Sequence, residues 1–66
     1  MNVELFEDAL KESGMRTKFL SDKLGISAQA FNKKRKGTTP FTLEEVKILR
    51  EPLKLTLKDI GNIFLE

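Results

Sequence analysis

The most basic stretch of the sequence is "NKKRKG" at residues 32–37, in which four bases follow one another. Small and amide side chains stand just before it, in "AQAFN" at residues 28–32. Amides can hydrogen-bond the polar edges of a ligand, and Lys and Arg bind anionic oxygens such as those of phosphates. The bases could equally line a solvated helix face that only aids solubility. The rest of the sequence bears on this choice.

Positive charge is concentrated in the middle third of the chain. Residues 1–22 hold five acids and three bases (−2), residues 23–43 five bases and no acid (+5), and residues 44–66 five acids and four bases (−1), which sums to the net +2 of the 66 residues. A block of like charges repels itself, so it predicts an anionic partner.

The residue types that catalysis uses most often are missing. The sequence has neither His nor Cys, which removes the commonest general base, the commonest metal ligand and any thiolate. Glu44 and Glu45 are adjacent and diverge on a helix, so they do not form a catalytic carboxylate pair. We therefore expect no enzyme, no metal or other cofactor and no small-molecule ligand.

Neither a membrane span nor a signal peptide is predicted. No apolar run approaches the roughly 20 residues that cross a bilayer. The first residues, "MNVELFEDAL", are acidic and amphipathic, unlike a secretory signal. We expect a cytoplasmic protein without a membrane partner.

The elements that position the basic stretch are predicted to be helices. Capping residues, glycines and prolines divide the chain into one all-α domain, a compact bundle of five short helices. Asn2, Ser27, Thr42 and Thr56 are the expected N-caps. The expected helices cover residues 3–13, 16–24, 27–36, 42–51 and 56–64. Alternating apolar residues in "LKLTLKDI" leave a short strand at 53–58 as an alternative.

Apolar residues at helical spacing predict the core. Helix 16–24 is expected to turn either Phe19 or Leu20 inward, and Met15 should pack beside it. Phe31 is the only large apolar residue of the third helix, so we assign it to the core. The other expected core positions are Leu5, Phe6, Ala9, Leu10, Leu24, Ile26, Leu43, Val46 and Leu49.

Residues 16–36 have the form of a helix-turn-helix unit. Their two helices are joined by "GIS", a three-residue turn that contains Gly. In such a unit the first helix crosses the DNA backbone and the second enters the major groove. Residues 28–36 supply small residues, amides and then bases, in the order that this placement needs.

The segment "GMRTKFLSDKLGISAQAFNKKRKG", residues 14–37, resembles the Cro-type (XRE-like) helix-turn-helix family of phage and bacterial repressors. "FTLEEVKIL" and "LKLTLKDI" resemble the later helices of that family, so the resemblance covers nearly the whole chain. It departs at Thr17, where the family commonly has Gln, at Arg50, a position usually small and buried, and at Pro52, where the family continues its helix. The matching residues are Leu20, Ser21, Leu24, Gly25, Ile26, Ser27, Phe31 and Gly37.

The resemblance implies a lambda-repressor-like fold and sequence-specific binding to double-stranded DNA, as a Cro-like transcriptional repressor in a bacterial or phage-infected cytosol. The implied base-contacting residues are Ala28, Gln29, Asn32 and Lys33. The phosphate-contacting candidates are Thr17, Lys18, Lys34, Arg35, Lys36, Thr38 and Thr39. Lys34 and Arg35 can also lie partly over the core, with their stems packed and their charged ends in water.

A dimer is also expected, because helix-turn-helix proteins commonly place two recognition helices in successive major grooves of a near-palindromic operator. Ile63, Phe64 and Leu65 are three successive apolar residues that cannot all face one small core, so they predict a weak homodimer. The alternative function is a helical protein-binding module, or an antitoxin-like protein, that uses the same fold.

Overall fold

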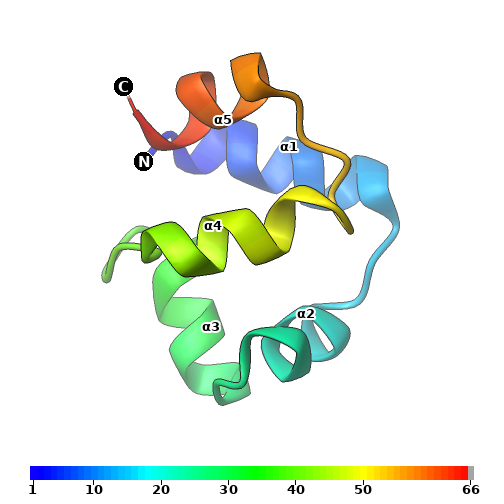
Figure 1. Cartoon of the computed structure of the whole chain (residues 1–66). Helices are drawn as coiled ribbons and strands as arrows, with labels where there is room; N and C mark the ends of the chain where they lie inside the picture. Colours follow the sequence, from blue (N-terminus) through cyan, green and yellow to red (C-terminus); the bar gives the residue numbers. More distant parts are fainter. Residues whose placement is uncertain (66) are drawn as a thin grey trace.

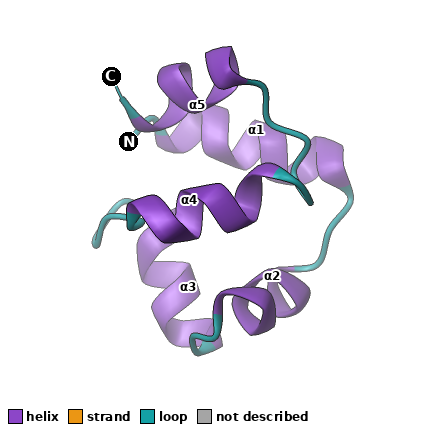
Figure 2. Ribbon diagram, viewed as in Figure 1, coloured by secondary structure: helices purple, strands orange, loops and turns teal. Residues whose placement is uncertain are grey.

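The computed structural model describes residues 1–65, which form five helices and no strand (Figures 1 and 2). The all-α prediction is therefore confirmed. Residues 53–58, the alternative strand, form a turn and the first residues of the last helix. The helices are α1 (Val3–Ser13), α2 (Thr17–Leu24), α3 (Ala28–Arg35), α4 (Leu43–Arg50) and α5 (Leu57–Phe64).

The helices begin where the sequence predicts N-caps. The side chain of Asn2 accepts a hydrogen bond from the Leu5 N–H, and that of Ser27 accepts one from Ala30, each at 3.0 Å. At the start of α4 and of α5 both hydrogen bonds of a capping box are present. These bonds satisfy N–H groups that a helix leaves free at its first turn.

Pro52 lies just after Arg50, the last residue of α4, in the turn that closes the helix, where the Leu53 N–H still donates to the Leu49 carbonyl at 3.1 Å. The chain makes a turn over residues 51–54, in which the Lys54 N–H donates to the Glu51 carbonyl (3.0 Å) and the Leu55 N–H to the Arg50 carbonyl (2.9 Å). This pair of bonds is the Schellman arrangement that closes many helices. Lys54 occupies its left-handed position with φ 53°, where Gly is usual.

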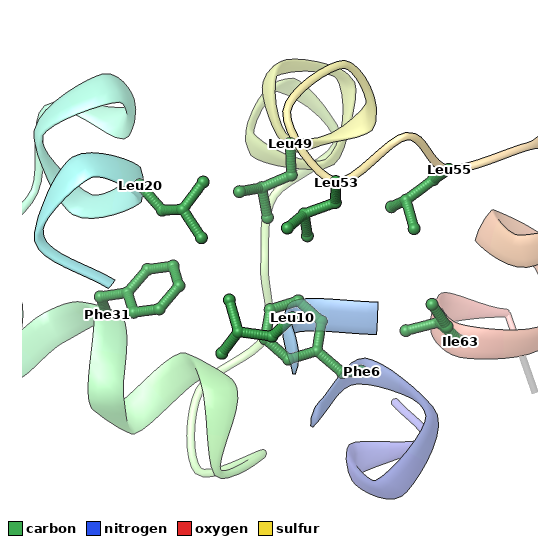
Figure 3. Packing of buried hydrophobic residues seen from close by; sticks show 8 residues of the cluster. All are labelled: Phe6, Leu10, Leu20, Phe31, Leu49, Leu53, Leu55 and Ile63. Atoms are coloured by element: carbon green, nitrogen blue, oxygen red, sulfur yellow. The ribbon is translucent and has the colours of Figure 1, made fainter. Parts of the chain in front are cut away.

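The core draws side chains from all five helices (Figure 3). Phe6, Leu20, Phe31 and Leu49 are fully buried. Phe41, in the segment before α4, packs its ring against Phe6, Phe31 and Phe64 at centroid distances of 5.2–6.0 Å. The other buried members of the cluster are Leu10, Leu53, Leu55 and Ile63.

Helix α1 lies along α5, and α2 contacts both α3 and α4. The backbone N–H of Asn2 donates to the carbonyl of Ile63 at 2.7 Å, which ties the start of α1 to the end of α5. The N- and C-terminal ends of the ribbon accordingly lie next to each other in Figure 1.

Three residues predicted for the core lie at the surface instead. Met15 is 37% exposed because it belongs to the extended link between α1 and α2, which no helix covers. Leu43 is 71% exposed at the first position of α4, and Leu5 is 39% exposed on α1. On α2 it is Leu20 that faces the core, whereas Phe19 remains 47% exposed.

Within residues 1–65, no helix combines the length and the apolar character that crossing a bilayer requires.

Candidate nucleic-acid interface

The side of α3 that faces solvent carries most of the predicted DNA contacts. Gln29, Asn32, Lys33 and Lys36 follow the i, i+3, i+4, i+7 spacing of one helical face. All four are exposed, as is the neighbouring Ala28. Among residues 1–65 none of the four polar side chains has a hydrogen-bond or ion-pair partner. We call these five residues the outer face of α3; its donors and acceptors are free to bind a ligand.

Phe31 holds the outer face in place from the opposite side of the helix. Its ring is fully buried and packs edge-on against Phe41, with centroids 6.0 Å apart. Phe31 is the buried residue of α3, and a buried aromatic ring contributes a large apolar area to a core. Phe31 is thus the apolar anchor that holds α3 against the core.

The turn between α2 and α3 is closed by backbone hydrogen bonds. Gly25 adopts the left-handed conformation (φ 71°) that ends α2, and the Ile26 N–H donates to the Ser21 carbonyl at 3.0 Å. Ile26 packs against the core, and Ser27 then caps α3. The "GIS" segment therefore connects the two helices through a short, hydrogen-bonded turn.

Lys34 points inward and pairs with Glu45 of α4. Its ammonium donates to the Glu45 carboxylate and lies 5.9 Å from the centroid of the Phe41 ring. The side chains of Lys34 and Glu45 are only 15% and 12% exposed. Because Glu45 also accepts from the Thr42 N–H at 2.8 Å, one carboxylate both caps α4 and holds α3.

Arg35 makes the corresponding contact with α1. Its Nε and Nη2 donate to the two carboxylate oxygens of Glu7 at 3.0 and 2.6 Å. This two-bond geometry is the strongest form of an Arg–carboxylate pair. Lys34 and Arg35 thus join α3 to α4 and α1, although Arg35 also lines a surface groove with Asn32 and Lys36.

Both carboxylates have shifted pKa values. The hydrogen bond from Arg35 lowers the pKa of Glu7 below its ordinary 4.5, and partial burial opposes this only in part. For Glu45, burial raises the pKa, but hydrogen bonds from Lys34 and Thr42 outweigh that effect and lower it. The hydrogen bond to Glu7 raises the pKa of Arg35. Both carboxylates are therefore ionised at neutral pH.

These pairs change the interpretation of the central charge block. Two of its five bases, Lys34 and Arg35, are neutralised by acids from outside residues 23–43. Lys23, Lys33 and Lys36 have no ion-pair partner within residues 1–65. Self-repulsion in the block is therefore weaker than the sequence indicates, and the free positive charge is confined to the solvent side.

The remaining phosphate candidates lie at two helix ends. Thr17 is half-buried in the first turn of α2, and Lys18, which is highly exposed, pairs with Asp22 at 3.2 Å. No side chain caps the start of α2 at Arg16, so N–H groups are free there. Thr38 and Thr39 are exposed directly after α3.

The predicted dimer surface is largely occupied by the fold itself. Ile63 is 3% exposed and belongs to the core, so its side chain cannot contact a partner in this structure. Phe64 is half-buried, with its ring packed edge-on against Phe6 and Phe41. Only Leu65, at 77% exposure, is free as the prediction requires.

The sequence analysis placed Lys34 and Arg35 partly over the core as an alternative, but with their charged ends in water, and it missed their ion pairs. They stand three and four residues after Phe31, so helical spacing places them beside the buried ring. That spacing could have separated them from Lys33 and Lys36. Their partners Glu7 and Glu45 lie far away in the sequence, and no local pattern identifies them.

Comparisons with protein-family models, with curated proteins and with solved structures found no match to this chain. The resemblance to the Cro-type family therefore rests on the sequence pattern alone. Within the described part of the chain, the geometry offers exposed amides and two lysines without ion-pair partners on one side of a short helix.

Proposed function

We propose that the chain binds double-stranded DNA sequence-specifically, by inserting α3 into the major groove, and acts as a Cro-like transcriptional repressor. The observation that carries the proposal is the outer face of α3. Its polar side chains are exposed and have no hydrogen-bond or ion-pair partner among residues 1–65, while Phe31 anchors the helix from behind. Unpaired amides and cations on a rigid helix are what base-edge and phosphate contacts require.

Each residue of the outer face has a chemical role in this proposal. Gln29 forms two hydrogen bonds to an adenine edge, and Lys33 donates to O6 or N7 of guanine. Ala28 contacts a thymine methyl group. Asn32 contacts either an adenine edge or a phosphate. Bases are thus distinguished by residues 28–33.

Phosphate contacts come from Lys36, Lys18, Thr17, Thr38 and Thr39. They set the position of the protein on the duplex and supply affinity that depends on salt. Lys34 and Arg35 are left out of this set, because contact with DNA would require breaking their ion pairs with Glu45 and Glu7. The N–H groups at the uncapped start of α2 favour a phosphate as well.

Binding as a dimer completes the proposal. Two copies place their α3 helices in successive major grooves, about 34 Å apart, on a near-palindromic operator. Leu65 and the exposed edge of Phe64 form the contact between the copies. The site of action is the cytoplasm of a bacterium or of a phage-infected host.

Selection from a pool of random duplexes, followed by sequencing of the retained DNA, tests the proposal. The expected result is an enriched inverted repeat with fixed half-site spacing, and a variant with Gln29→Ala should lose preference at one base position. Gln29 is exposed, so the variant keeps the core. Retention without an enriched motif would contradict sequence-specific binding.

The alternative is a helical protein-binding module or antitoxin-like protein. The exposed apolar residues at the start of α2 favour it. Duplex binding that does not respond to salt, together with a protein that co-purifies, would support this alternative over DNA recognition.

A further inference from the structure

An apolar surface lies at the start of α2, outside the outer face of α3. Met15 and Phe19 are 37% and 47% exposed. Two shallow grooves meet at these side chains, and both are lined by them. One groove extends along α2 to Asp22, and the other runs to Pro52 and Lys54 after α4. We call the area formed by Met15, Phe19 and the two grooves the Phe19 surface.

The fold does not require these apolar side chains. On α2 the core position is taken by Leu20, which is fully buried, and Leu24 packs against the same cluster. Phe19 lies outside this cluster, and the Lys23 ammonium stands over its ring, 5.7 Å from the centroid. A contiguous exposed apolar area beside hollowed grooves is typical of a site for another molecule.

The rim of the Phe19 surface is basic. Four cations line the grooves, against the two acids Asp22 and Glu51. Lys18 pairs with Asp22, but the other three cations have no ion-pair partner within residues 1–65. The surface therefore has a net positive charge around an apolar centre. The four cations are Arg16, Lys18, Lys23 and Lys54.

We propose that the Phe19 surface binds an acidic segment of a partner protein. The segment presents a large apolar side chain, Phe or Leu, to Met15 and Phe19, and flanking Asp or Glu residues pair with Arg16, Lys23 and Lys54. Both halves of this chemistry are needed. The apolar centre offers nothing to a phosphate backbone, and the basic rim excludes a cationic segment.

A bilayer surface is the competing occupant, because basic and apolar groups together also bind anionic lipid. The geometry favours the protein segment. The apolar side chains lie between grooves and beside the carboxylates of Asp22 and Glu51, whereas membrane binding needs a broad apolar face that can be buried among the lipids.

The Phe19 surface shares no residue with the outer face of α3, and of the proposed phosphate contacts it includes only Lys18. The side chain of Phe19 itself is assigned no DNA contact. Phe19→Ala should therefore leave duplex binding unchanged. The two proposals can fail separately: Gln29→Ala tests the outer face, and Phe19→Ala tests the Phe19 surface.

The experiment is an NMR titration of the 15N-labelled chain with a short synthetic peptide that is rich in Glu and carries Phe and Leu one helical turn apart. Shifts are expected at residues 15–23 and 51–54. Phe19→Ala and Lys23→Glu should each weaken binding by about tenfold, the size of effect seen when an interface anchor is removed. Leu57→Ala removes a side chain that is 71% exposed on α5 and is the matched control, with unchanged affinity.

Two further peptides separate the contributions, one with Ala in place of Phe and Leu and one with Lys in place of Glu; neither should bind. Equal binding of the Ala peptide, shifts outside the named residues, or no shift at millimolar peptide would overturn the proposal. So would preferential binding to vesicles of phosphatidylglycerol and phosphatidylcholine. Shifts at Phe19 on concentrating the protein alone would instead identify a second copy as the occupant.

Discussion

The inner and outer sides of α3 carry the same kind of charge in different surroundings. On the inner side, Lys34 and Arg35 flank the buried Phe31 and end on carboxylates of α4 and α1. On the outer side, Lys33 and Lys36 are exposed and have no ion-pair partner within residues 1–65. Four consecutive bases thus divide into a structural pair and a free pair.

The difference separates two demands on one short helix. A helix that binds DNA must present free cations, and it must also be held at a fixed angle. In α3 the inner cations and Phe31 provide the attachment, so the outer cations remain available. Positive charge alone therefore does not identify a phosphate contact. The face of the helix that carries a base determines whether its charge is available to a ligand.

Removing the anchor should have the largest effect. Phe31→Ala leaves a cavity under α3 and should lower the free energy of unfolding by about 3–5 kcal/mol, which is most of the stability of a small domain. Phe19→Ala is the matched control: the same substitution on a half-exposed side chain should cost less than about 1 kcal/mol. Urea denaturation followed by circular dichroism measures both, and equal losses would show that Phe31 is not the anchor.

Breaking the inner attachment should have the next largest effect. Glu45→Gln removes the charge that pairs with the nearly buried Lys34 and weakens the capping box of α4. We expect a loss of about 2 kcal/mol in the free energy of unfolding. Glu44→Gln changes the exposed neighbouring residue and should stay within about 0.5 kcal/mol. A similar loss in both variants would contradict the role assigned to Glu45.

Acid should weaken the same attachment without a mutation. The pKa values of Glu7 and Glu45 are lowered in the folded chain, so their pairs stabilise it above the ordinary carboxyl value of 4.5. That stability is lost as pH falls below 4.5 and through the lower folded-state values. Thermal unfolding between neutral pH and pH about 3 should show this loss. A Glu7→Gln/Glu45→Gln double variant should lose less stability over the same pH range. An identical dependence of stability on pH in the two proteins would show that Glu7 and Glu45 do not cause the loss.

The outer and inner cations should also differ in DNA binding. Lys36→Ala should weaken binding to all duplexes alike and reduce the slope of log affinity against log salt by about one unit. Lys34→Met should leave that slope unchanged, because its ammonium is already paired within the protein. Fluorescence anisotropy at several salt concentrations measures both slopes. If Lys34→Met reduces the slope as well, Lys34 leaves Glu45 to contact phosphate.

The smallest effect concerns a position away from α3. Lys54 adopts a left-handed conformation that costs an L-residue about 1 kcal/mol. Lys54→Gly should therefore stabilise the chain by about 0.5 kcal/mol once the greater freedom of Gly in the unfolded state is counted. Lys47→Gly, at an exposed position in the middle of α4, should instead destabilise it by about 1 kcal/mol. Denaturant midpoints should move in opposite directions.

The sequence predicted the secondary structure well, because short-range chemistry determines it. Asn2, Ser27, Thr42 and Thr56 cap helices as expected, since a cap needs only its own side chain and an N–H group three residues on. The predicted ends agree with the observed ones to within two residues.

Tertiary choices were harder to predict. Phe19 and Leu20 are both apolar and adjacent on one helix, and only the position of α2 against α4 decides which is buried. Met15 could not be placed either, because helical periodicity does not apply to a residue between two helices and so cannot predict whether its side chain is buried. The partners of Lys34 and Arg35 stand 11 and 28 residues away, beyond any local pattern. The outer face of α3 could be predicted because it depends on helical spacing alone.

The hydrogen bond between Asn2 and Ile63 has a consequence for protein engineering. It brings the two ends of the described chain together, so a short flexible linker could join them, and new ends could be opened elsewhere. The exposed segment around Thr38 and Thr39 is a suitable place, because it lies between α3 and α4. Such a circular permutant would keep all five helices and would free α3 from its chain connection to α4, leaving the Lys34–Glu45 pair as the direct ion-pair link between them.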